Sequence, residues 1–102
     1  MYVRVWQYEV HPDAVAQFVA AYGPSGDWAE LFDRAEGYGG TELFRSTSAP
    51  TRFVTIDRWA SQDRWDRFRA DWADAYAALD ARLDRLTARQ EDLSRWDVGR
   101  AP

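Results

Sequence analysis

Asp57 is the residue of this chain best placed for acid–base chemistry. It lies in residues 51–59, a run of β-branched and aromatic side chains that predicts a strand. Because side chains alternate along a strand, Asp57 shares one face with Phe53, Thr55 and Trp59. A carboxylate on such a face is costly unless it is paired or hydrogen-bonded, and its pKa is often shifted. Two interpretations stay open: a functional acid or base, or the structural partner of an arginine.

Other side chains are candidates for the same chemistry. His11 has an intrinsic pKa near neutrality, and a tyrosine hydroxyl can bind a ligand oxygen. We therefore take Asp57, Tyr76 and His11 as the candidate acid–base residues. His11 precedes a proline at a corner between a strand and a helix, where exposure to solvent is the usual outcome. The candidate cations that would neutralise Asp57 or an anionic ligand are Arg4, Arg52 and Arg58.

Aromatic residues make up 16% of the chain and include six tryptophans, enough to wall a ligand cavity as well as a core. Trp28 follows a glycine-containing turn on a short segment, and binding residues often gather at such places. For aromatic residues at helical spacing after residue 61, ordinary core packing is the alternative. The candidate ligand-binding residues are Trp6, Tyr8, Trp28, Phe32, Tyr38, Thr55, Trp65 and Trp72.

Length and composition exclude several classes of protein. The 102 residues predict one domain over 1–102. The net charge of −4 argues against nucleic-acid binding, because no basic surplus is available for phosphates. No apolar run approaches the roughly 18 residues of a membrane span. Cysteine is absent and the N-terminus lacks the pattern of a signal peptide, so we expect a cytoplasmic protein without disulfides.

Periodicity predicts alternating strands and helices. Apolar positions at steps of three and four after Ser61 predict a long helix to about residue 86, with a break near residues 71–75. The expected elements, in chain order, are a strand over 2–10, a helix over 15–22, a short helical turn over 27–34, strands over 41–45 and 51–59, the long helix, and a last strand over 94–98.

This order predicts an α+β, ferredoxin-like βαββαβ fold, in which helices cover one face of an antiparallel four-stranded sheet. Both faces of the strands carry apolar residues, however. Val54 and Ile56 lie opposite the face of Phe53 and Trp59. The second face therefore needs a cover as well, and we expect a homodimer whose sheets pack face to face.

Residues 22–32, 37–43 and 52–59 resemble the antibiotic biosynthesis monooxygenase family, a branch of the dimeric α/β-barrel superfamily. The resemblance covers nearly the whole chain. It implies a dimeric α/β barrel with a ligand cavity between sheet and helices in each subunit. Members of the family include cofactor-free oxygenases that convert anthrones to quinones, haem-degrading enzymes and polyketide-cyclase-like proteins.

The resemblance is strongest to the cofactor-free oxygenases of secondary metabolism, which act on aromatic or polyketide-type molecules. It implies that a tryptophan and a tyrosine of the second helix have counterparts in Trp65 or Trp72 and in Tyr76. The asparagine that some of these oxygenases use is absent. Haem-degrading relatives hold iron with a histidine on the second helix, whereas His11, the chain's only histidine, precedes the first.

We therefore expect no haem, no metal site and no other cofactor, and a small aromatic ligand. Two alternatives stay open beside the oxygenase. One is a non-catalytic dimeric domain that binds a ligand or serves as an accessory, and the other is a cyclase or isomerase on the same fold.

Overall fold

The computed structural model describes residues 1–94 and the backbone of residues 96 and 97. The strands are β1 (Tyr2–Val10), β2 (Tyr38–Arg45), β3 (Arg52–Trp59), β4 (Thr87–Asp92) and β5 (Trp96–Asp97). The helices are α1 (Val15–Tyr22), α2 (Asp27–Phe32), α3 (Gln62–Asp71) and α4 (Ala73–Leu83), with single 3₁₀ turns η1 (Pro12–Ala14) and η2 (Asp84–Leu86). None of these helices is long and apolar enough to cross a membrane.

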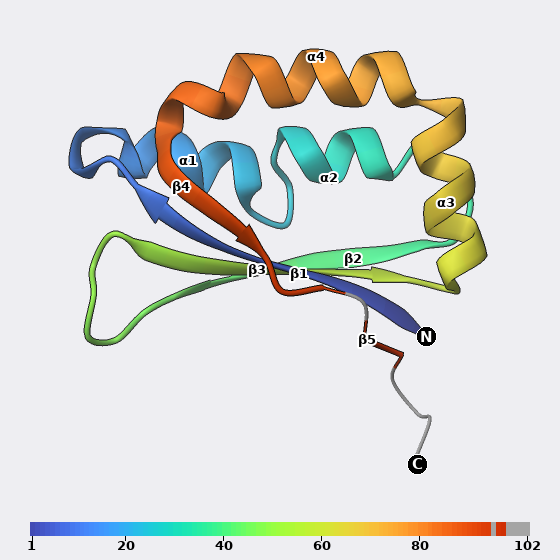
Figure 1. The fold of residues 1–102 in the computed structure, drawn as a ribbon, viewed down its shortest axis with the longest axis horizontal. Helices are drawn as coiled ribbons and strands as arrows, with labels where there is room; N and C mark the ends of the chain where they lie inside the picture. Colours follow the sequence, from blue (N-terminus) through green and yellow to red (C-terminus); the bar gives the residue numbers. More distant parts are fainter. Residues whose placement is uncertain (95, 98–102) are drawn as a thin grey trace.

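The strands form one antiparallel sheet in the order β2-β3-β1-β4, and β5 pairs with the start of β1. The helices lie on one face of this sheet, with α4 as the outermost layer (Figure 1). The ferredoxin-like α+β prediction is therefore confirmed. The two central strands, β1 and β3, lie beneath the helices and present their inward side chains to them. These side chains are therefore placed to form a site between the sheet and the helices.

The prediction for the last strand was wrong in its position. The fourth long strand is Thr87–Asp92, paired with β1, and not residues 94–98. In the predicted segment 94–98, residues 96 and 97 form the short strand β5, while residues 95 and 98 lie outside the described residues. Residues 87–92 are polar and mostly exposed, so they form a strand through their hydrogen bonds to β1 more than through side-chain burial.

The predicted long helix is two helices that meet at Trp72. Ser61 caps α3, because its hydroxyl accepts a hydrogen bond from the backbone N–H of Arg64. Trp72 leaves the helical conformation with φ −116° and ψ 27°, inside the segment where a break was expected. The two helices can therefore approach the sheet from different directions, with α3 across its end in Figure 1.

The core lies between sheet and helices and is largely aromatic. The side chains that are most completely buried are Phe18, Trp59, Phe68 and Leu86. The alternation predicted for β3 is confirmed, because Phe53, Thr55, Asp57 and Trp59 are buried. On the opposite face Val54 and Ile56 are half-buried and Phe44 is 48% exposed. No helix of the described residues covers that face (Figure 1).

Candidate active site

A cavity of about 330 Å³ lies between the sheet and the helices. Seven of its fifteen lining residues are aromatic and the others are polar or charged, and every long strand and every α-helix contributes to the walls. Such a volume is at the small end of the range for ligand sites. The lining residues are Arg4, Trp6, Tyr8, Tyr22, Trp28, Phe32, Thr41, Thr55, Asp57, Trp65, Arg69, Tyr76, Asp80, Gln90 and Asp92.

Asp57 lies on β3 at the floor of this cavity and is only 6% exposed. Its direct neighbours across the sheet are Arg4 on β1 and Thr41 on β2. The Thr41 hydroxyl donates a hydrogen bond to Oδ1 of Asp57 at 2.6 Å. Among the described residues no arginine forms an ion pair with Asp57, and the hydrogen bond from Thr41 engages one of its two oxygens. The structural ion-pair interpretation of Asp57 is not what the structure shows.

Burial raises the pKa of Asp57 to about 6, while the hydrogen bond from Thr41 and the positive charge of Arg4 partly oppose that rise. A carboxyl group with this pKa is ionised near neutral pH and can still be reprotonated readily. These are the properties of a general base. Asp57 therefore combines a suitable pKa with a position in a cavity wall.

The three arginines that were candidate partners of Asp57 have other partners. Arg52 pairs with Glu9, and Arg58 pairs with Glu42. Arg4 forms an ion pair with Asp92, 3.2 Å from Nη2 to Oδ2. The Arg4 guanidinium also lies 4.7 Å from the centre of the Trp65 ring. Arg4 thus brings positive charge to the cavity floor without neutralising Asp57 through direct contact.

A β-bulge in β2 places Tyr38 beside Thr41, the hydrogen-bond donor of Asp57. The pairing of β2 with β3 shifts by one residue between Tyr38 and Gly40, and Gly40 has φ 113°. Residues three apart in a regular strand point to opposite faces. The extra residue instead turns Tyr38 and Thr41 to the same face, opposite Trp59 and Asp57 respectively. The hydroxyls of Tyr38 and Thr41 then lie 2.5 Å apart.

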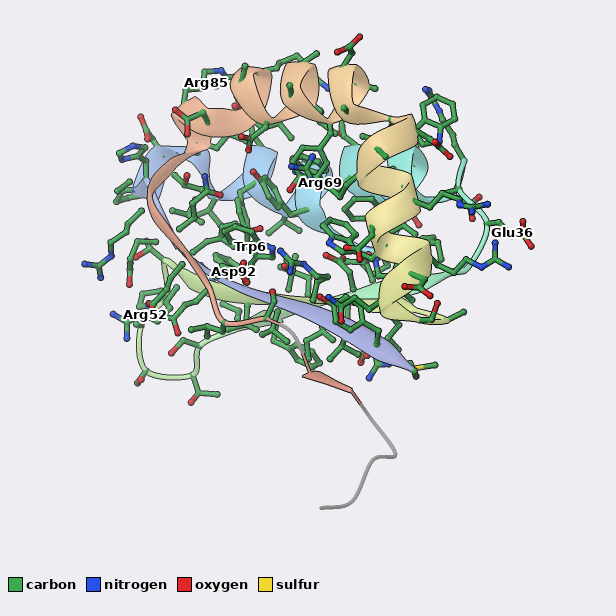
Figure 2. All side chains as sticks on the ribbon, turned by 45° about the vertical axis from the view of Figure 1, so that its right-hand side comes forward. Trp6, Glu36, Arg52, Arg69, Arg85 and Asp92 are labelled. Carbon is green, nitrogen blue, oxygen red and sulfur yellow. The ribbon has the colours of Figure 1, made fainter. Side chains whose placement is uncertain are left out.

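Charged side chains form part of the cavity lining. Figure 2 shows Trp6, Arg69 and Asp92 in the space enclosed by β4, α3 and α4. Arg69 and Asp92 are exposed, and the Arg69 guanidinium lies 3.8 Å from the centre of the Tyr76 ring. Burial raises the pKa of Tyr76, although Arg69 opposes this. Tyr76 therefore stays a neutral hydrogen-bond donor at the cavity wall at physiological pH.

Most of the residues predicted from the sequence meet in this cavity. Those that line it are Trp6, Tyr8, Trp28, Phe32, Thr55, Asp57, Trp65 and Tyr76. Three others do not. His11 is exposed just before η1, and Trp72 lines a separate groove between residues 34–36 and α3. Tyr38 is half-buried and contacts Thr41, behind the cavity wall.

Sequence reasoning missed several lining residues, including Thr41, Arg69 and Gln90. The adjacent glycines at positions 39 and 40 were the available signal for Thr41, because such a pair often marks a bulge. Gln90 and Asp92 were missed together with their strand. Among the described residues no group of three His, Cys, Asp or Glu side chains is arranged to hold a metal ion.

Solved structures share this architecture. A variant of SnoaB, a cofactor-independent oxygenase from Streptomyces nogalater, superposes with a TM-score of 0.79 at 20% identity, over 97% of this chain and 93% of that chain. A putative antibiotic biosynthesis monooxygenase from Nitrosomonas europaea gives 0.72 at 17% identity, over 96% and 90%. One from Bordetella bronchiseptica gives 0.70 at 25% identity, over 94% and 95%. No curated protein matches the sequence.

The sequence also carries a family signature of its own. Residues 1–79 match the model of the antibiotic biosynthesis monooxygenase family. That range contains β1 to β3, α1 to α3 and Asp57. The chain therefore belongs to the antibiotic biosynthesis monooxygenase family.

Proposed function

We propose that this protein is a cofactor-independent oxygenase of secondary metabolism that acts on a planar aromatic or polyketide-type molecule. The observation that carries the proposal is the placement of Asp57, a buried carboxylate with one unengaged oxygen at the floor of an aromatic-walled cavity. Membership of the family and the likeness to an oxygenase fold support the reaction class.

The proposed reaction begins with proton transfer to Asp57. Its Oδ2 takes a proton from an acidic C–H of the substrate, as in the methylene of an anthrone, and the electron pair stays on the substrate as a delocalised carbanion. Dioxygen adds to this anion to form a peroxide anion, which takes the proton back from Asp57 and becomes a hydroperoxide. Loss of water from the hydroperoxide leaves a carbonyl, so one oxygen atom ends in the quinone and the other in water.

The cavity walls would stabilise the anion. Tyr8 and Tyr76 are lining phenols whose pKa values burial raises, so both remain protonated and able to donate hydrogen bonds to an enolate oxygen. Trp6, Trp28 and Trp65 offer flat apolar surfaces on which aromatic rings stack. The Arg4 charge beside Asp57 favours an anion at the cavity floor.

The test is oxidation of an anthrone in air. Purified protein incubated with dithranol should produce quinone absorbance and consume one dioxygen per quinone. The rate should rise with pH through an inflection near the Asp57 pKa of about 6, because only the carboxylate accepts a proton. Autoxidation is subtracted with a blank that lacks protein. If dithranol and several hydroquinones bind but give no quinone above the blank, the protein is a binding domain instead.

We further propose a homodimer formed by the open sheet face. Half-buried Val54 and Ile56 and the exposed Phe44 lie on the face that no described helix covers. Apolar side chains there would gain about 25 cal/mol for every square ångström that a second copy buries. The two cavities would then lie on the outer sides of the paired sheets.

Ile56→Arg should dissociate this dimer. The substitution places a charge in the centre of the proposed interface, where it would lie close to its symmetry mate. Light scattering coupled to size exclusion should then give the mass of one chain, against twice the 11.8 kDa chain mass for the unaltered protein. Asp66→Arg, which places an arginine at an exposed position of α3 on the helical side of the sheet, is the control. A monomer before any substitution would refute the dimer.

A further inference from the structure

A short chain of hydrogen bonds leads from Asp57 away from the cavity. Thr41 donates its hydroxyl proton to Asp57 at 2.6 Å, so the proton between Thr41 and Tyr38, 2.5 Å apart, comes from Tyr38. Both distances are shorter than the usual O–H···O distance of about 2.7 Å, and the bond from Thr41 ends on a carboxylate, to which O–H donors bind at such short distances.

These two hydrogen bonds connect a buried side chain to one that is partly exposed to solvent. Asp57 is 6% exposed, whereas Tyr38 is half-buried and does not line the cavity. The bond between Tyr38 and Thr41 depends on the bulge between Tyr38 and Gly40, which brings these two residues to one face of β2. A strand without that extra residue would point the Tyr38 hydroxyl away from Thr41.

In an occupied cavity this second connection is a route by which Asp57 can exchange a proton with solvent. Among the lining residues, Arg69 and Asp92 are exposed and lie in the space enclosed by β4, α3 and α4 (Figure 2). A planar ligand that fills about 330 Å³ would lie between these residues and Asp57, so water could not reach Asp57 from the ligand side.

We propose that Thr41 and Tyr38 form a proton relay that connects Asp57 to solvent while the cavity is occupied. The inference rests on the proposed function, because it takes Asp57 as the base. Tyr38 does not line the cavity, and Thr41, which does line it, acts through its hydrogen bond to Asp57.

The relay moves one proton in three linked transfers. After Oδ2 has taken the substrate proton, a half-turn about the Cβ–Cγ bond brings the protonated oxygen to Thr41, and this torsion has a broad two-fold profile. Asp57 then gives that proton to Thr41, Thr41 gives its own to Tyr38, and Tyr38 releases one to water. Each hydroxyl ends with one proton, and Asp57 is again a carboxylate.

The first test needs no substrate. Protonation of Asp57 should reverse the donor direction of the chain, so the NMR signal of the labelled Tyr38 ring should titrate together with the labelled Asp57 carboxyl. Thr41→Val should remove this shared titration from Tyr38, while the Tyr2 ring serves as an internal control. A Tyr38 signal that does not titrate with Asp57, or that titrates equally in Thr41→Val, would overturn the relay.

The second test separates the relay from the proposed function. Asp57 in the unaltered protein should exchange the methylene protons of dithranol for deuterium in anaerobic heavy water, because the relay replaces each abstracted proton. In Tyr38→Phe the proton held by Asp57 returns to the substrate carbanion, so exchange should fall severalfold. Aerobic oxidation should fall less, because there the peroxide takes the proton from Asp57. Equal losses in both reactions, or none in either, would refute the relay. Full activity in Asp57→Asn would instead refute Asp57 as the base.

Discussion

Asp57→Asn should abolish oxidation and at the same time stabilise the folded protein at alkaline pH. The amide cannot accept the substrate proton, but its oxygen can still accept the hydrogen bond from Thr41. Turnover of dithranol should therefore fall by a factor of about 10² or more, as expected when a general base is lost. Ligand binding should persist, because the shape of the cavity is unchanged.

The gain in stability follows from the raised pKa. In the unfolded chain Asp57 ionises near 3.8, whereas in the folded protein its pKa is about 6. Ionisation therefore disfavours the folded state, and stability decreases as pH rises between these two values. A pKa difference of about two corresponds to about 3 kcal/mol above pH 6. Because asparagine has no charge, Asp57→Asn avoids this loss.

Chemical denaturation at acidic and alkaline pH measures the effect. The free energies of unfolding of the two proteins should be similar near pH 4 and should differ by about 2–3 kcal/mol near pH 8, in favour of Asp57→Asn. Asp66→Asn, which removes an exposed carboxylate from α3, is the matched control and should show no such divergence. A variant that is less stable than the original at pH 8 would mean that the carboxylate is structural.

Trp59→Ala should cause the largest loss of stability in the chain. The Trp59 side chain has no exposed surface, and its ring centre lies 5.2 Å from that of Phe68 and 5.4 Å from those of Trp65 and Tyr38. Truncation removes these contacts and leaves a void, which costs about 3–5 kcal/mol. A domain of this size is typically stable by only about 5–15 kcal/mol, so part of the population should unfold.

Denaturant unfolding followed by circular dichroism measures this loss. Trp59→Phe is the informative companion, because it keeps an aromatic ring and removes an indole N–H that has no hydrogen-bond partner among the described residues. Its cost should be clearly smaller than that of Trp59→Ala. If Trp59→Ala lost less than about 1 kcal/mol, the aromatic cluster would not be the tightly packed core described above.

The features that depend on the burial of large side chains could be predicted from the sequence. Alternation along β3 placed Asp57 on the inward face, because one wrong step would have exposed Phe53 and Trp59 together with it. Apolar spacing located both helices after Ser61, and the break fell at Trp72 as expected. In each case a row of large side chains had only one face on which it could be buried.

The missed features depend on pairing between backbones. Residues 87–92 contain little that favours a strand, and their conformation follows from the hydrogen bonds to β1. Thr41 was overlooked because regular alternation puts it on the wrong face relative to Tyr38, and only the bulge reverses this. The absence of an ion pair at Asp57 was likewise beyond the sequence, because thirteen arginines were available and the geometry of each decides its partner.

The polar residues of β4 limit how a second molecule can add a strand to this edge of the sheet. A bare strand edge invites pairing with another molecule, which leads to fibres or precipitates. From Ala88 to Asp92 every residue of β4 is exposed, and three of them carry charge. Such an edge repels an incoming strand, so growth of the sheet in its own plane is discouraged on that side. The polar residues because of which β4 was not predicted as a strand thereby also protect the molecule from aggregation.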